Sequence, residues 1–66
     1  MTQKEMVKEL EALVKSIQRN ENECIREMGF LNKHGFALER EAVRYKQLAY
    51  NDCWLALLNV IDKIRV

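Results

Sequence analysis

The sequence contains no proline and only two glycines, Gly29 and Gly35. These two residue types interrupt helices most often, so little in the chain opposes long helices. Glu, Lys, Leu, Ala and Arg, which favour the helix, are frequent. The composition predicts an all-α fold for these 66 residues.

Cysteine and histidine are also scarce. The two cysteines, Cys24 and Cys53, are too few to form the disulfide framework of a small secreted domain. They belong to no CxxC element and no zinc-ligand spacing, and we expect both to be small buried apolar residues. His34 is the only histidine, and the sequence places no nucleophile or orienting carboxylate beside it. We therefore expect no catalytic residue, no metal and no cofactor.

The chain has neither an excess of charge nor a long hydrophobic run. Its 11 basic and 10 acidic residues leave a net charge of +1, without the basic excess of a nucleic-acid-binding protein. The longest nearly apolar run, Cys53 to Ile61, has nine residues, whereas a membrane-spanning helix needs about 20. Charged residues from Lys4 onward rule out a secretory signal. We expect a cytoplasmic protein without a membrane partner.

A first helix is predicted over about residues 3–33. Thr2 and Glu5 form a capping-box pattern, and Met1 and Met6 occupy the two positions of a hydrophobic staple. One apolar face is marked at helical spacing by Met6, Leu10, Leu13, Val14 and Ile17. A polar stretch over residues 18–23 weakens this face, but steps of seven residues continue it to Cys24 and Leu31. We prefer one continuous helix; the alternative is a three-helix arrangement with a break near Asn20.

The clearest turn lies at residues 32–36. Gly35 can adopt the left-handed conformation that ends a helix, and Phe36 can make the apolar contact that accompanies it. A second helix is then predicted over about residues 37–65. Two helices of similar length joined by a short turn predict an antiparallel hairpin, a single domain that spans residues 1–66.

The second predicted helix carries two apolar seams at different angles around its axis. The first, which we name the alanine seam, consists of Leu38, Ala42, Tyr45, Ala49, Cys53, Ala56 and Val60. The second, which we name the Trp54 seam, consists of Val43, Tyr50, Trp54, Leu57, Ile61 and Ile64. One neighbouring helix can cover only one of them, so the other seam implies a partner.

Small residues allow two helices to approach closely, so we assign the alanine seam, including Tyr45, to the contact within the hairpin. The Trp54 side is then left for a second molecule. The predicted interface residues are Tyr50, Trp54, Leu57, Leu58, Ile61 and Ile64. Two hairpins packed in this way would form a homodimeric four-helix bundle. The expected partner is a second copy, a heterologous protein, or both.

These features favour a small non-enzymatic protein-interaction module, such as an inhibitor, adaptor or co-chaperone, that acts through an apolar helix face. The alternative is a dimeric RNA- or DNA-binding regulator of the helical-hairpin type. Its contacts would be Lys33, Arg40, Arg44 and Lys46. Glutamates such as Glu41 interleave with these residues, so a solvated charged surface is the favoured interpretation and nucleic acid the less favoured partner.

In size and helical-hairpin layout the chain resembles two groups, the Rop-like RNA-binding hairpin dimers and the small helical co-chaperones of type III secretion needle subunits. Tyr45, Leu48, Leu55 and Ile61 lie at spacings similar to those in the second helix of the co-chaperones. The resemblance implies a helical hairpin that binds RNA or protein. No functional residue is carried over from either group.

Overall fold

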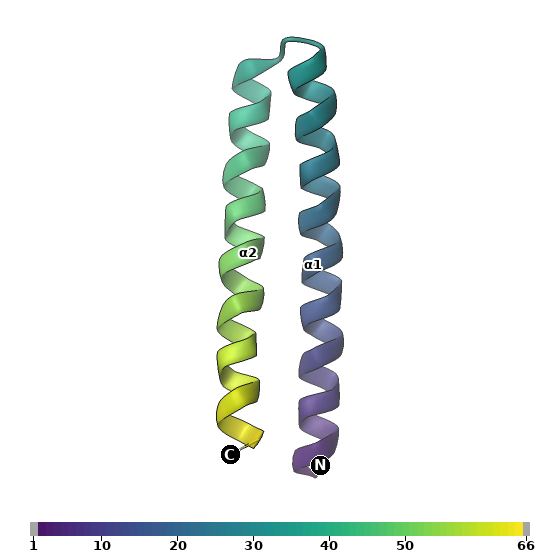
Figure 1. Cartoon of the computed structure of the whole chain (residues 1–66), viewed down its shortest axis with the longest axis vertical. Helices are drawn as coiled ribbons and strands as arrows, with labels where there is room; N and C mark the ends of the chain where they lie inside the picture. The colour runs from purple at the N-terminus through teal and green to yellow at the C-terminus, as the bar shows by residue number, and fades with distance from the viewer. Residues whose placement is uncertain (1, 66) are drawn as a thin grey trace.

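The structure is a computed structural model that describes residues 2–65. It contains two helices, α1 over Gln3–Lys33 and α2 over Ala37–Arg65. The helices lie side by side and antiparallel, with the turn at one end of the molecule and both chain ends at the other (Figure 1). The Cα trace measures 49 Å along the hairpin and only 14 by 13 Å across it. The predicted all-α hairpin is confirmed.

Helix α1 begins as its capping pattern predicts. Thr2 is the N-cap, and its hydroxyl oxygen accepts a hydrogen bond from the Glu5 backbone N–H at 3.2 Å. The predicted hydrophobic staple involves Met1, which lies outside the described residues. The helix continues without a break through the polar stretch at residues 18–23. The three-helix alternative is therefore wrong.

The turn is a Schellman motif. Gly35 has a φ of 78°, in the left-handed region. The Phe36 N–H donates to the Leu31 carbonyl at 2.9 Å, and the Gly35 N–H donates to the Asn32 carbonyl at 3.3 Å. These two bonds satisfy carbonyls that the end of a helix would otherwise leave open. The chain thereby reverses within a few residues and brings α2 back along α1.

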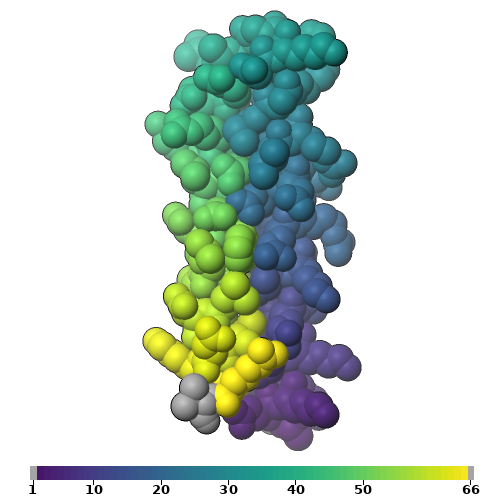
Figure 2. Space-filling view, in the orientation of Figure 1, coloured from purple at the N-terminus to yellow at the C-terminus, as the bar shows by residue number. Residues whose placement is uncertain are grey.

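The core is a thin strip between the two helices. Val7 and Val14 of α1 and Ile61 of α2 are its buried centre, and the side chains packed against them are Leu10, Trp54, Leu57 and Ile64. Side chains of the two helices meet along the length of the hairpin (Figure 2). On α1 the buried face is rotated from the predicted one, because Met6 and Leu13 are 41% and 48% exposed.

The Trp54 seam packs against α1, so the assignment of the two seams made from the sequence is wrong. Ile61 is 2% exposed, and the other five residues of this seam are half-buried. All seven residues of the alanine seam are exposed, including Tyr45 and Cys53, which were both expected to be buried. The reason is the apolar area buried: every residue of the Trp54 seam has a large side chain, whereas three of the seven residues of the alanine seam are alanines, so covering the Trp54 seam removes more apolar surface from water.

Neither described helix combines the length and the apolar character that crossing a bilayer requires.

The two glycines should respond with opposite signs to the same substitution. Gly35→Ala places a side chain at positive φ and should destabilise the fold by about 1–2 kcal/mol. Gly29→Ala adds a Cβ inside α1 with nothing within 4 Å of it, and should stabilise the fold by about 0.5–1 kcal/mol. Urea denaturation followed by circular dichroism measures both changes. Equal effects at the two positions would contradict the assigned turn.

Candidate protein-binding surface

The part of α2 that α1 does not cover exposes several large apolar side chains. Leu38 is 85% exposed and Tyr45 is 67% exposed. The exposed large hydrophobic side chains of α2 are Leu38, Tyr45, Leu48, Leu55, Leu58 and Val60. Soluble monomers seldom carry extended apolar patches of this kind unless the patch binds something. This side of α2 is therefore the candidate binding surface.

The alanine seam contains three of these six side chains, Leu38, Tyr45 and Val60. At about 100° per residue, its seven members lie within about 40° of a line through Ala49 that runs along α2. Leu48 and Leu55, which are 42% and 44% exposed, lie about 100–120° around α2 from this line on one side. Ala42, Ala49 and Ala56 are also exposed. Along this surface, large projecting side chains therefore alternate with alanines, whose small side chains leave gaps between them.

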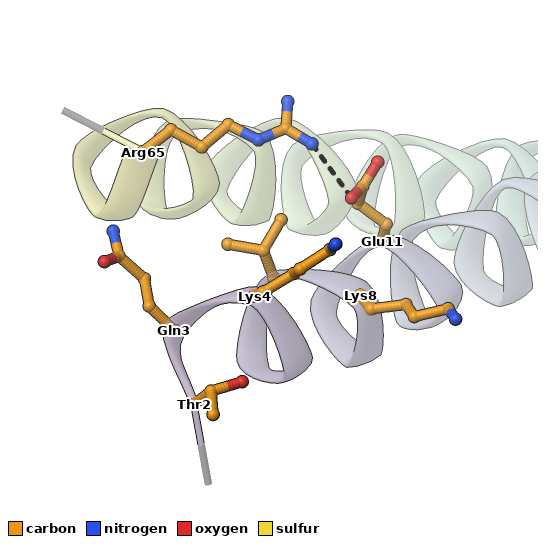
Figure 3. Close-up of a pocket in the computed structure, with 7 residues that line it drawn as sticks. Thr2, Gln3, Lys4, Lys8, Glu11 and Arg65 are labelled. Carbon is orange, nitrogen blue, oxygen red and sulfur yellow. Dashed lines mark hydrogen bonds and ion pairs between the residues drawn. The ribbon is translucent and has the colours of Figure 1, made fainter.

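One flank of the hairpin is charged. Near the chain ends, Arg65 of α2 pairs with Glu11 of α1 at 2.9 Å. These two side chains point toward each other across a shallow hollow (Figure 3). The hollow is lined by Thr2, Gln3, Lys4, Val7, Lys8, Glu11 and Arg65. In the same region the Gln3 side-chain amide donates to the Ile64 carbonyl. Groups of both signs and an aliphatic floor make this flank a solvated edge that ties the two ends together.

The opposite flank is apolar. Met6 and Leu13 of α1 lie about 140–160° around their helix from Glu11, and Val60 lies about 140° around α2 from Arg65. Because the Glu11–Arg65 pair marks one flank, these residues belong to the other. Met6, Leu13, Cys53 and Val60 are all exposed. The apolar surface therefore extends from the alanine seam across this flank onto α1.

A buried carboxylate lies between the helices near the middle of the hairpin. Glu21 is 7% exposed. The Trp54 indole N–H donates to Glu21 Oε1 at 2.8 Å, and the Gln47 amide donates to Glu21 Oε2 at 2.5 Å. The Trp54 bond, followed by those from Gln47 and Asn51, lowers the pKa of Glu21 below its ordinary value of 4.5, although burial acts in the opposite direction. Glu21 is therefore ionised at neutral pH and stabilised by neutral donors.

Reasoning from the sequence missed Glu21, because it stands in the polar stretch that interrupts the apolar face. A signal was available. Glu21 follows Val14 by seven residues, as Val14 follows Val7, and residues seven apart share a helix face. A glutamate on the buried face that Val7 and Val14 mark requires a hydrogen-bond donor from α2, and the Trp54 indole N–H is such a donor.

The six predicted interface residues lie mostly inside the hairpin. Tyr50, Trp54, Leu57 and Ile64 are half-buried, Ile61 is 2% exposed and Leu58 is 36% exposed. Their contact with a second molecule stays a prediction. The strongly exposed apolar residues of α2 form a different set, of which only Leu58 was named.

Two of the four basic residues proposed for nucleic-acid contact pair with the same glutamate. Arg40 lies 3.5 Å from Glu41 and also donates to the Asn32 side chain at 3.0 Å. Arg44 pairs with the same Glu41 at 3.2 Å. Lys33 belongs to the last turn of α1, where a cation stabilises the helix end. Lys46 is exposed on α2. Two of the four charges are thus balanced locally by one glutamate.

The remaining candidate groups are separate from one another. His34 is the exposed C-cap of α1, and its ring lies 4.4 Å from the Phe30 ring, centroid to centroid. Cys24 and Cys53 are free thiols; Cys24 is buried, as expected. Across residues 2–65, no three His, Cys, Asp or Glu side chains gather as a metal-binding group.

No protein-family model, curated protein or solved structure matches this chain. The functional interpretation therefore rests on the surface and the core described above.

The buried carboxylate predicts a pH effect on stability. Glu21→Gln removes the charge but keeps the shape. Because the pKa of Glu21 is lower in the folded than in the unfolded chain, ionised Glu21 stabilises the fold above the unfolded pKa, and this contribution is lost as the pH falls through the folded pKa. The free energy of unfolding of the wild type, relative to that of Glu21→Gln, should therefore fall as the pH is lowered below 4.5.

Urea denaturation at a series of pH values measures this difference. Glu23→Gln is the matched control, because Glu23 is exposed on the same helix. A difference between wild type and Glu21→Gln that stays constant with pH would contradict the inferred ionisation.

Proposed function

We propose that this chain is a cytoplasmic, non-enzymatic protein-interaction module. It acts through the alanine seam of α2, together with the exposed Leu48 and Leu55 of the same helix. The observation that carries the proposal is the exposure of these residues, led by Leu38 at 85% and Tyr45 at 67%. The chain's own core uses the other seam, so this surface has no role in closing the hairpin. Apolar surface of this extent gains stability when a partner removes it from water.

The shape of the surface suits a partner helix. From Leu38 to Val60 the seam runs about 33 Å along one straight element. Its alanines leave gaps between the larger side chains of Leu38, Tyr45 and Val60. Side-chain ridges on a second helix can pack into such gaps. A protein that presents an apolar helix is therefore the partner class. A second copy of the hairpin belongs to this class, and two copies would form a four-helix bundle, though through the alanine seam and not through the Trp54 seam expected from the sequence.

Inhibitors, adaptors and co-chaperones are the roles that such a module fits. The alternative, a nucleic-acid-binding regulator, needs cations that converge on phosphates. Arg40 and Arg44 instead share Glu41. The binding experiment below separates the two functions.

Replacing Tyr45 by aspartate should abolish partner binding without unfolding the chain, because Tyr45 is exposed and makes no contribution to the buried core. The tagged chain is immobilised and exposed to lysate of its source organism and to a differently tagged second copy. The wild type should retain a protein after nuclease treatment and in high salt. Tyr45→Asp should retain at least about tenfold less, the effect of burying one unpaired charge at an interface.

Ile25→Asp is the control, since Ile25 is 49% exposed on α1. Circular dichroism checks that both variants keep their helicity. Retained material that nuclease or salt removes would favour the nucleic-acid alternative. Equal retention by Tyr45→Asp and wild type would place the binding site elsewhere.

A further inference from the structure

Resting on the proposed function, we infer that a second copy of this chain occupies the alanine seam, with its α2 antiparallel to the first and a two-fold axis passing beside Ala49.

The seam residues are arranged symmetrically about Ala49. Tyr45 and Cys53 lie four residues to either side of it, and Leu38 and Val60 lie eleven residues to either side. Ala42 and Ala56 are seven residues away. Rotation about an axis at Ala49 therefore places every seam residue opposite another seam residue. A two-fold interface requires this self-complementarity.

The facing side chains also match in size. Ala49 faces its own copy and Ala42 faces Ala56, which allows the two α2 axes to approach to about 8 Å. Tyr45 faces the small Cys53, and Leu38 faces Val60 at each end of the contact. None of the seven residues carries a charge. The seven seam residues themselves therefore place no ion in the contact that would lose its hydration.

The surface area of the hairpin agrees with one such contact. The chain exposes 5186 Å² and has a mass of 7.8 kDa, whereas folded monomers of this mass expose about 4,400 Å². A standard interface buries about 800 Å² on each partner. The excess surface of one hairpin is therefore about what a stable dimer covers.

The positions of the apolar flank and of the charged flank of the hairpin agree with this two-fold dimer. Met6 and Leu13 lie on the same flank as Cys53 and Val60, and a two-fold axis perpendicular to α2 puts the equivalent flanks of both copies on one side. The two α1 helices then lie on that side, with their exposed apolar residues turned toward each other. The Glu11–Arg65 ion pair stays on the opposite, solvated side.

Cysteine cross-linking tests the register. In a Cys53→Ser background, Ala49→Cys should form a disulfide-linked dimer by itself, because the two positions 49 meet at the axis. Ala42→Cys should not cross-link alone, since the two positions 42 would lie about 21 Å apart, and disulfides require Cα atoms within about 7 Å. A mixture of Ala42→Cys and Ala56→Cys should cross-link.

Light scattering on the wild type should give twice the chain mass of 7.8 kDa. Ala49→Glu should weaken the dimer at least about 100-fold, because it places two like charges together. Ala12→Glu, at an exposed position of α1, is the matched control and should leave the dimer intact. Circular dichroism verifies that every variant remains helical.

Cross-linking of Ala42→Cys alone would overturn the antiparallel register in favour of a parallel one. A wild-type mass of one chain, with no cross-linking of Ala49→Cys, would overturn the second copy as partner. In that case the proposed function would still stand if a foreign protein is retained in a Tyr45-dependent manner. It would fail too if Tyr45→Asp changes nothing.

Discussion

Helix α2 has only one neighbour within the chain, and this constraint shapes the rest of the molecule. A single packed helix covers one stripe of its partner, while α2 carries apolar residues on two. The hairpin uses the stripe with the larger side chains, from Trp54 to Ile64. The stripe that remains uncovered holds Leu38, Tyr45 and the alanines. The surface available for binding is therefore determined by which stripe of α2 packs against α1.

The buried Glu21 strengthens that choice. Its carboxylate needs hydrogen-bond donors when it is removed from water, and these donors, Trp54 and Gln47, lie on the side of α2 that faces α1. Turning α2 so that the alanine seam faced inward would leave the carboxylate without these donors. A polar group in an otherwise apolar strip can specify one packing over its alternatives in this way. The orientation of α2 thus depends on apolar area and on one charged group together.

The small size of the core links folding to association. Four apolar side chains are buried within the described residues, and domains of this length are marginal when they fold alone. A partner that binds only the folded hairpin adds its binding free energy to the stability of the fold. The turn connects the two helices at one end of the hairpin, and the exposed Glu11–Arg65 pair links them near the other. Stability and binding are therefore expected to rise together with partner concentration.

Local sequence signals were enough to determine the helices, because capping, glycine conformation and helical periodicity act over a few residues. Thr2 with Glu5 set the start of α1, Gly35 set its end, and the seven-residue steps carried it across Asn20. The existence of two seams on α2, one more than a hairpin can cover, was also readable from spacing. Which seam faces α1 was not, because that depends on the total area buried and on Glu21 meeting Trp54, residues 33 positions apart. Only the tertiary structure brings these distant groups together, and it thereby decides that Tyr45 faces solvent and Trp54 faces the core.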